Sequence, residues 1–511
     1  MSSDEIVPRN GCQPAAPGRD FICGSAGSRH GAGMAEASTM RRGASALLAK
    51  FLMLLAMSFA ALLQPAAAQS LLRDAETELL FRDMSRPIIA AAGLRPENVQ
   101  IVLINDKSIN AFVAGGQIVY IHSGLITAAD NANEVQGVIA HELGHITGGH
   151  VIRFGEGVKM ATGIMLLSLL LGAAAMAAGG GEAGAGIMAA GGQAAMGKFL
   201  AFTRTQESSA DAAGAKYLTG AGISGKGSLS FFKKLQNLEF RYAMPQEDSY
   251  ARTHPLSGER IAALENVYQT ASSWNTPTDP KLEARFQRVK AKLSGFVEDP
   301  RQTLVKYPES NKSVPARYAR AYAWHKSAYP EKANAEVDAL LKAEPNDPFF
   351  LELQGQVQLE SGKPREALAS LRRAVSLAPD QPLISALFGH ALIATEDKAN
   401  FEEAKQVLKS AIGRDNSNPF AWYQLGIVYD REGDHARAAL ATAERYNLEG
   451  DRMMALTSAR TAMGGIRTGT TDCLRAQDIA LASRAALVDD KKTPDRIRKR
   501  LDDKPLVCAG G

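Results

Sequence analysis

The chain has 511 residues, of which 45% are hydrophobic, enough to build a sizeable core and two to four domains. Its formal net charge is only +4, and acidic and basic residues are mixed along the chain. The composition therefore gives no indication of a nucleic-acid partner.

Residues 1–68 are predicted to be a leader that is removed from the mature protein. A group of basic residues precedes an apolar run over residues 51–63, and Ala66-Ala67-Ala68 then forms an A-x-A cleavage site. This order of basic, apolar and small residues is typical of a secretory signal peptide. An alternative start of translation at Met34 or Met40 would shorten the leader. The sequence thus predicts an exported protein.

The four cysteines divide between the leader and the exported part. Cys12 and Cys23 lie in the leader, which leaves Cys473 and Cys508 in the mature chain. An even pair in an exported protein favours one disulfide that ties down the C-terminal tail. Two unpaired thiols are the alternative.

The first elements of the mature chain are predicted to be one helix and three strands. Residues 70–94 are charged and amphipathic, as expected of a helix. Strands are predicted over residues 99–104, 110–113 and 117–122, with the turn dipeptide Gly115-Gly116 between the last two. A further helix is predicted to begin near Asn131.

This helix carries an H-E-x-x-H motif, formed by His141, Glu142 and His145. Histidines four residues apart point to the same side of a helix and can share one metal ion. Zinc suits such ligands and lowers the pKa of a bound water to about 7, and Glu142 can hold and deprotonate that water. Apolar residues around the motif indicate a buried helix face. The alternative is two helix histidines beside a surface glutamate, and His150 is interpreted as a plain helix residue.

A catalytic zinc ion keeps three protein ligands and one open position, so a third ligand is needed. The best candidate is Glu207, in a helix-compatible run of residues 207–214. Asp211 lies one turn later on the same face, where it can accept the second ring N–H of a ligand histidine. For Glu207 the alternative is a solvated helix side chain.

Between the motif and Glu207 lies an apolar segment. Residues 160–181 are uncharged and long enough to cross a bilayer, but a single crossing would separate the two histidines from Glu207. A second span through residues 183–197 would be short and mostly Gly and Ala. We interpret residues 157–200 as a mobile insert beside the cleft, either a lid or a surface that contacts membrane or apolar substrate. A buried helical hairpin and an integral-membrane peptidase that spans through residues 160–200 are the alternatives.

Beyond residue 313 the chain is periodic. Small and apolar residues recur with the 34-residue spacing of tetratricopeptide repeats, and the clearest unit contains Leu351, Gly355, Gln358, Gly362, Ala367, Leu371, Ala374 and Pro379. Four units are predicted, with a degenerate fifth from Glu449. Such repeats commonly hold an extended peptide or a partner protein in their concave face. The tail from about Thr468 is interpreted as a solvated helix or loose end.

Three motifs in this order resemble the HtpX/Oma/BepA group of zinc gluzincin peptidases: H-E-L-G-H at residues 141–145, E-S-S-A-D at residues 207–211 and His254-Pro255. The resemblance implies that His141, His145 and Glu207 bind zinc, that Glu142 is the general base and that Asp211 supports a ligand. It implies that His254 either stabilises the transition state or caps the open site as a fourth ligand. An ordinary loop histidine is the alternative. It also implies that a sheet edge beside the zinc helix receives substrate as an added strand.

The export signal, peptidase core and repeats together resemble the BepA-like branch of this group. The expected fold is α+β and mostly α, with a gluzincin metallopeptidase domain containing a small β-sheet, followed by a tetratricopeptide α-solenoid. The expected boundaries are residues 1–68 for the leader, 69–300 for the peptidase domain, 301–465 for the repeats and 466–511 for the tail.

The resemblance implies a periplasmic endopeptidase with Zn²⁺ as cofactor, which hydrolyses unfolded or stalled outer-membrane proteins. The repeats would dock the β-barrel assembly machinery, and the protein would make peripheral contact with a membrane. The alternative function is a latent or non-proteolytic periplasmic chaperone or scaffold that acts through the repeats.

Overall fold

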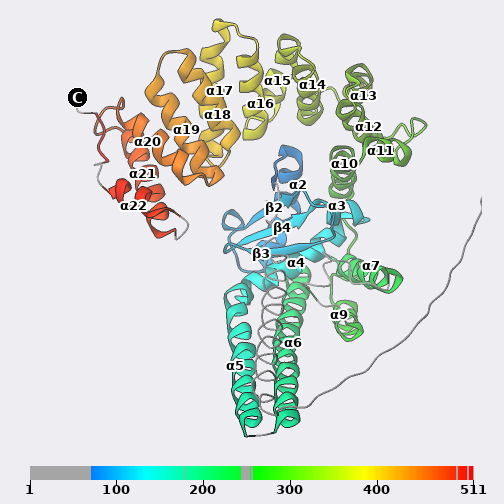
Figure 1. Ribbon diagram of the computed structural model, residues 1–511. Helices are drawn as coiled ribbons and strands as arrows, with labels where there is room; N and C mark the ends of the chain where they lie inside the picture. The colour runs from blue at the N-terminus through cyan, green and yellow to red at the C-terminus, as the bar shows by residue number, and fades with distance from the viewer. Residues whose placement is uncertain are drawn as a thin grey trace, which may run out of the picture. The chain divides into compact units, whose positions relative to one another are not determined.

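The computed structural model describes residues 71–178, 180–242, 254, 257–490, 493–502 and 506–509 (Figure 1). The chain divides into residues 1–68 and residues 69–511, and the second unit is described here. The predicted leader, its cleavage site, Cys12, Cys23 and the alternative starts at Met34 and Met40 all lie outside the described residues.

The region predicted to be the peptidase domain, residues 69–300 and called the peptidase half below, contains a four-stranded sheet in the order β1-β2-β4-β3. Its strands are β1 (Leu71–Leu72), β2 (Gln100–Ile104), β3 (Ala111–Ala114) and β4 (Ile118–His122). β2 and β4 are parallel, while the other two pairings are antiparallel. The three predicted strands are confirmed to within one residue, and both glycines of the β3–β4 turn have a positive φ, 63° and 98°.

The first predicted helix is α2 (Ala75–Ala91), shorter than predicted because β1 occupies the start of that segment. Asp74 caps α2, since its side chain accepts a hydrogen bond from the backbone N–H of Thr77 at 2.8 Å. The short helices η1 (Pro96–Asn98) and α3 (Ser123–Ala128) follow in the sheet region.

Helix α4 (Ala132–Thr147) carries the H-E-x-x-H motif and begins where the sequence predicts. The side chain of Asn131 accepts a hydrogen bond from the N–H of Glu134 at 3.0 Å, and the Glu134 side chain accepts one from the N–H of Asp130 at 2.8 Å. This reciprocal capping defines the helix start. All residues from Ala132 to His145 are buried, so α4 runs through the core of the peptidase half.

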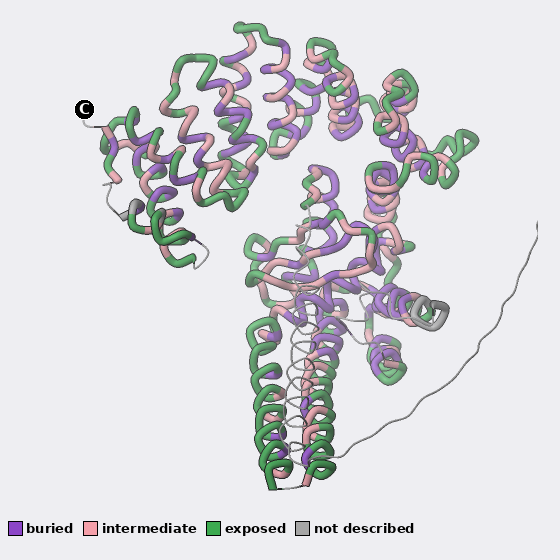
Figure 2. The backbone as a smooth tube through the Cα atoms, in the orientation of Figure 1, coloured by how far each residue is buried: buried purple, intermediate pink, exposed green. Residues whose placement is uncertain are grey.

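Two long antiparallel helices follow, α5 (His150–Ala177) and α6 (Gly181–Gly220) (Figure 1). Residues 157–200 are thus not a separate insert, because they are the outer parts of two regular helices. The alternative prediction, a buried helical hairpin, is correct that these residues form a helical hairpin. It is wrong that they lie inside the protein. Figure 2 shows instead that most of the hairpin surface is exposed. Among the described residues, α5 is the one helix long and apolar enough to cross a membrane by length and composition.

The peptidase half continues through α7 (Lys226–Tyr242), α9 (Gly258–Thr270) and α10 (Pro280–Val297). The last of these is the charged helix predicted after the Pro-containing linker. The core of the peptidase half is formed by α2, the sheet, α4 and these helices. Its buried residues include Phe81, Ile139, Leu218, Phe231 and Phe286.

The predicted repeats are confirmed as successive helix pairs. After α11 (Pro300–Lys306) the helices are α12 (Val314–Lys326), α13 (Pro330–Ala343), α14 (Pro348–Glu360), α15 (Pro364–Leu377), α16 (Pro382–Ala394), η2 (Lys398–Asn400), α17 (Phe401–Arg414), α18 (Pro419–Arg431), α19 (His435–Glu449), α20 (Arg452–Met463), α21 (Thr471–Asp489) and α22 (Asp495–Asp502). A Cβ at Gly355 would lie 2.3 Å from the Leu371 side chain, so this glycine lets α14 and α15 cross closely.

The C-terminal region is packed more firmly than predicted. α21 buries Cys473, Ala476 and Ile479 in a core shared with α20, so residues 471–489 are a packed helix and not a solvated tail. Cys473 and Cys508 form a disulfide with a Cα–Cα distance of 6.1 Å. Of the two alternatives for these cysteines, the structure contains the paired one.

Candidate metal centre

The two histidines of α4 point to one place, as their spacing predicts. The Nε2 atoms of His141 and His145 lie 3.1 Å apart, and the two side chains are 3% and 10% exposed. A helix turn separates the two residues, so the backbone of α4 alone fixes this pairing. The alternative interpretation, two helix histidines beside a surface glutamate, does not account for two buried rings that lie this close together.

Glu207 reaches the same place from α6. One carboxylate oxygen lies 3.4 Å from His141 Nε2, and the other lies 3.3 Å from His145 Nε2. The two helices approach closely because Gly144 has no side chain: a Cβ there would lie 2.6 Å from the backbone oxygen of Ala210. Gly214 makes a similar approach to Ala140, at 3.1 Å. Glycine in the motif therefore lets α6 bring its carboxylate to α4.

His254 adds a fourth donor atom. Its Nδ1 lies 3.2 Å from His141 Nε2 and 3.1 Å from the Glu207 carboxylate, and the His254 side chain is buried. One donor atom from each of His141, His145, Glu207 and His254 lies within 4.8 Å of the others. The structure thus joins the loop histidine to the two helices.

The spacing of these donor atoms suits a metal ion. Five donor–donor distances fall between 3.1 and 3.4 Å. A tetrahedral ion with bonds of about 2.0 to 2.1 Å places its ligand atoms about 3.3 Å apart. Imidazole nitrogens and a carboxylate are ligands that zinc accepts in this geometry. The residues present therefore fit a tetrahedral metal site.

Side chains around the donors hold them in position. Asp211 lies 2.9 Å from the Nδ1 of His141, on the ring atom that faces away from the site. Arg260 donates two hydrogen bonds to Asp211, at 2.7 and 2.8 Å, and lies 3.2 Å from Glu207. The predicted contact between Asp211 and a motif histidine is present, whereas no role of Arg260 is predicted from the sequence.

His150 is also more than a plain helix residue. It is the first residue of α5, it is buried, and its Nδ1 lies 3.0 Å from the Nδ1 of His145. Each motif histidine thus has a partner on its outer nitrogen, Asp211 for His141 and His150 for His145. Such partners fix the tautomer and the ring orientation of ligand histidines.

Electrostatics in the site favour charged carboxylates. Burial by itself lowers the pKa of His141, but hydrogen bonds and charges from Asp211 and Glu207 raise that pKa to about 10. Burial raises the pKa of Glu207 and Asp211, yet both pKa values end below the usual range because histidines and Arg260 stabilise the charged forms. Burial lowers the pKa of His150 to about 4, so this imidazole is neutral.

Glu142 stands beside the donors with its carboxylate unengaged. Its side chain is buried, and among the described residues neither carboxylate oxygen has a hydrogen-bond partner. Nε2 of His254 lies 3.4 Å from one of these oxygens. The same nitrogen lies 3.3 Å from the backbone oxygen of Ala111 in β3. His254 therefore sits between the donor cluster, Glu142 and the edge strand of the sheet.

The sequence matches two family profiles in separate parts of the chain. Residues 72–268 match peptidase family M48, and residues 350–381 match the tetratricopeptide repeat. Residues 72–268 are a peptidase family M48 domain. The convergent His–His–Glu–His group lies within this M48 domain, and the chain is accordingly a metallopeptidase with a repeat region.

Several known proteins are similar to this chain. The beta-barrel assembly-enhancing protease of Escherichia coli K12 is 24% identical over 375 residues, which cover 72% of this chain and 75% of that protein. The metalloprotease LoiP of the same organism is 31% identical over 169 residues, covering 32% of this chain and 60% of LoiP. The crystal structure of YrrB, a TPR protein, is 22% identical, covers 35% of this chain and 93% of that chain, and has a TM-score of 0.28.

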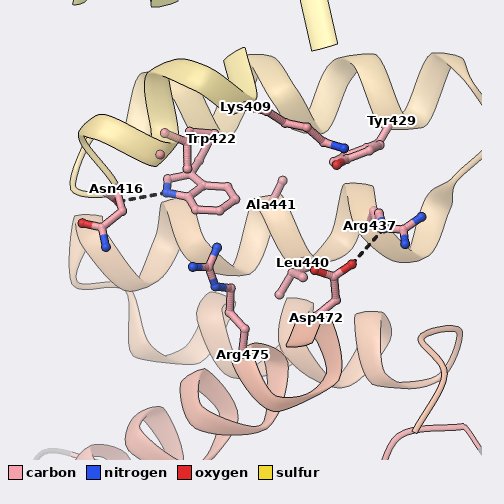
Figure 3. A pocket seen from close by; sticks show the side chains of 11 residues that line it. Lys409, Asn416, Trp422, Tyr429, Arg437, Leu440, Ala441, Asp472 and Arg475 are labelled. Carbon is pink, nitrogen blue, oxygen red and sulfur yellow. Dashed lines mark hydrogen bonds and ion pairs between the residues drawn. The ribbon is translucent and has the colours of Figure 1, made fainter. Parts of the chain in front are cut away.

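A cavity of about 370 Å³ lies in the repeats, outside the M48 domain (Figure 3). Trp422 forms part of its wall, and Lys409, Arg437 and Arg475 bring positive charge to it. Two of these charges are already paired, Arg437 with Asp472 at 2.8 Å and Arg475 with Glu444 at 3.2 Å. Two of the three positive charges at the cavity are therefore already offset by acidic partners.

Proposed function

We propose that this chain is a zinc-dependent endopeptidase of the exported compartment that cleaves unfolded protein segments. The observation that supports this most directly is the meeting of His141, His145 and Glu207 at one point beside the buried carboxylate of Glu142, which accepts no hydrogen bond from the described residues. A protein that used these residues only for packing would gain nothing from leaving a buried carboxylate without a hydrogen bond.

In the proposed mechanism, His141, His145 and Glu207 hold the metal. Zinc, when bound, supplies Lewis-acid polarisation of the scissile carbonyl and of the attacking water. Glu142 takes a proton from that water and passes it to the leaving amine. Asp211, held by Arg260, keeps the His141 ring in the tautomer whose Nε2 faces the site.

His254 is proposed to latch the site in the structure described here. Its Nδ1 stands at the fourth position of the donor cluster, the position that a catalytic zinc site keeps open for water or substrate. Withdrawal of His254 would open that position and release Glu142 from its neighbour. A latched enzyme is also compatible with the alternative function of a scaffold. The repeats could bind their partners while the metal site stays closed.

The edge strand β3 is the proposed receiver of substrate. In the sheet order β3 pairs with β4 alone, and it begins at Ala111, whose backbone oxygen contacts His254. An exposed strand edge binds any extended chain through main-chain hydrogen bonds. Such recognition suits a peptidase that acts on unfolded segments of varied sequence.

The relatives named for β-barrel assembly suggest the biological setting. We propose a periplasmic location and, as substrates, unfolded or stalled outer-membrane proteins, with the repeats contacting the β-barrel assembly machinery. The disulfide between Cys473 and Cys508 suits an oxidising compartment. The proposed domains are residues 69–300 for the peptidase, 301–465 for the repeats and 466–511 for the C-terminal segment.

The deciding experiment compares the mature chain with Glu142→Gln. We expect both to contain one zinc per chain by elemental analysis, and we expect casein cleavage by Glu142→Gln to fall by at least about 100-fold, the scale for loss of a catalytic base. Glu331→Gln, an exposed residue of α13, is the matched control and should cleave like the wild type. A mature chain without bound zinc, or a Glu142→Gln variant with wild-type cleavage, would contradict the proposal.

A further inference from the structure

The hairpin of α5 and α6 exposes an unusual apolar surface that the peptidase mechanism does not use. Exposed large apolar residues follow α5 from end to end, among them Ile152 at 88% and Leu170 at 70% exposure, together with Met165, Leu166, Leu167, Leu169 and Leu171. Met196 and Leu200 continue this surface on α6. Soluble proteins rarely leave a continuous apolar patch of this kind uncovered.

The hairpin does not need a partner to bury its inner face. A Cβ at Gly157 would lie 2.5 Å from the ring of Phe202, a Cβ at Gly191 would lie 1.9 Å from Ser168, and a Cβ at Gly172 would lie 2.8 Å from the backbone of Gly184. Small residues therefore let the two helices approach closely at three levels, and at Gly172 and Gly184 their backbones are in contact, as in membrane helix pairs. The interface between α5 and α6 is therefore filled by residues of the hairpin itself.

The outer face is apolar around a wide arc. Residues 165–167 are all exposed, and so are residues 169–171. Three consecutive helix residues cover about 200° of the helix circumference. A protein partner buries one stripe of about 100°, whereas a helix that is apolar nearly all round suits hydrocarbon on every side. The pattern favours lipid as the occupant.

The hairpin is uncharged between its basic base and its tip, where Glu182 is exposed. Residues 160–177 of α5 and 183–197 of α6 contain no charged side chain, which corresponds to about 27 Å and about 22 Å of helix. The hydrocarbon layer of a bilayer is about 30 Å thick. At the base stand Arg153, Lys159, Lys198 and Arg204, all exposed, against the single acid Glu156. The contact between Gly157 and Phe202 places Lys159 and Lys198 at the same level.

We propose that the α5–α6 hairpin inserts tip first into a lipid bilayer, with its basic base in a layer of anionic phospholipid headgroups. Lysine and arginine at such a level place their charged ends among the headgroups. Glu207 lies nine residues beyond Lys198 on the same helix, about 13 Å along its axis. If the proposed function holds, the insertion keeps the metal centre just above the membrane surface, where it would cleave chain segments held close to lipid.

Flotation with vesicles tests this inference without any use of the peptidase activity. The mature chain is mixed with vesicles of phosphatidylethanolamine and phosphatidylglycerol, or with vesicles of phosphatidylcholine alone. We expect flotation with both, and tighter binding to the anionic vesicles. Leu167→Arg/Leu170→Arg should lower binding to both kinds by at least about tenfold, because arginine in the hydrocarbon layer is costly. Val305→Arg/Leu377→Arg, at exposed apolar positions of the repeats, should bind like the wild type.

Charge reversal at the base tests the second part of the inference. Lys159→Glu/Lys198→Glu should lower binding to the anionic vesicles by at least about tenfold and leave binding to phosphatidylcholine nearly unchanged. A fluorophore on Leu170→Cys should shift to shorter wavelength with vesicles, while the same label on Val305→Cys should not. This measurement keeps the test decisive if a double arginine variant fails to fold.

Three results would overturn the inference. The wild type could fail to float with either vesicle, or Leu167→Arg/Leu170→Arg could float as well as the wild type. The hairpin could instead join two copies, seen in sedimentation as a dimer that the arginine variant dissociates and that does not bind vesicles. Glu142→Gln should float like the wild type, so loss of the proposed peptidase function and loss of membrane insertion give separate signals.

Discussion

His254 lies at the meeting point of the metal donors, Glu142 and strand β3, and its role decides whether the site is open or closed. The motif around it does not distinguish a latch from a group that stabilises the oxyanion. The structure favours the latch, because Nδ1 of His254 stands at hydrogen-bond distance from both His141 and Glu207.

Replacement of His254 by alanine should therefore raise casein cleavage several-fold, with zinc content unchanged because three ligands remain. The measurement is the initial cleavage rate per zinc-loaded chain. A fall of about 100-fold, the usual loss when an oxyanion donor is removed, would assign His254 to transition-state stabilisation instead. Unchanged inactivity of both proteins with zinc bound would favour the scaffold function.

Arg260 shows how a functional contact escapes sequence reasoning. In the sequence, Arg260 is a basic residue in the first turn of α9, shortly after the His254 loop. That pattern is common on solvated helices and does not indicate a functional contact. The structure buries the guanidinium against Asp211 and Glu207. Two buried carboxylates are stabilised by a cation in addition to any metal. No spacing in the chain reveals which residue supplies that cation.

Arg260→Leu should weaken zinc binding by about 10- to 100-fold, because Asp211 would lose the two hydrogen bonds that orient it toward His141. Competition with a chelator measures the affinity. Arg285→Leu, a half-exposed arginine of α10 that pairs with Asp83, is the control and should bind zinc like the wild type. An Arg260→Leu variant with wild-type affinity would show that Asp211 holds its position without help.

At the scale of elements, the crossing of α4 and α6 positions the metal centre. Their closest approach is at Gly144, between the two ligand histidines of the motif and against Ala210. The glycine of H-E-L-G-H thus has a structural reason, since any side chain would separate the helix that carries the histidines from the helix that carries Glu207.

Gly144→Ala should lower the free energy of unfolding by about 1 to 3 kcal/mol, the usual cost of overpacking a tight contact, and should reduce zinc content. Urea denaturation and elemental analysis give the two readouts. Gly197→Ala is the control on α6, because a Cβ there meets no atom within 4 Å, and alanine stabilises helix interiors. Equal stability of both variants would mean that the crossing adapts to a methyl group.

At the scale of the whole unit, buried charges join the M48 domain to the repeats. Lys292 of α10 is only 5% exposed and contacts Asp74 and Glu76 at the start of α2. The hydroxyl of Tyr318 in α12 donates to Glu76 at 2.8 Å, which extends the cluster into the first repeat. The proposed boundary at residue 300 is therefore crossed by a polar network and not by a loose linker.

Lys292→Met should lower the free energy of unfolding by about 3 to 5 kcal/mol, because it leaves Asp74 without its cation and leaves Glu76, which is buried, with Arg288 alone. Charges in the cluster raise the pKa of Lys292 despite burial, and Lys292 helps to lower the pKa of Asp74. The stability that Lys292 contributes is therefore lost only as pH rises through the raised pKa of Lys292. The stability that Asp74 contributes is lost only as pH falls through the lowered pKa of Asp74. Burial raises the pKa of Glu352 to about 8, and Lys292 holds that pKa down, a contribution that appears only at higher pH. The loss of stability should therefore be constant from about pH 5 to about pH 7.

Urea denaturation at several pH values checks this prediction. Lys363→Met, on the exposed surface of the repeats, is the control and should change stability by less than about 0.5 kcal/mol. A similarly small effect of Lys292→Met would show that the buried cluster adds no stability, and a loss that grows between pH 5 and pH 7 would contradict the assigned pKa directions.

The sequence by itself determined the features that depend on local spacing. The i and i+4 histidines, the capped start of α4, the strands of the sheet and the 34-residue repeats all follow from helix, strand and repeat periods. Only the tertiary structure brought Arg260 to the metal donors and His150 behind His145, and it decided between the alternatives left open for His254 and for Cys473 with Cys508. It also decided that residues 157–200 form an exposed hairpin. The physical reason is that such meetings depend on where helices cross, and a crossing such as that at Gly144 is set by packing between segments more than sixty residues apart in the chain.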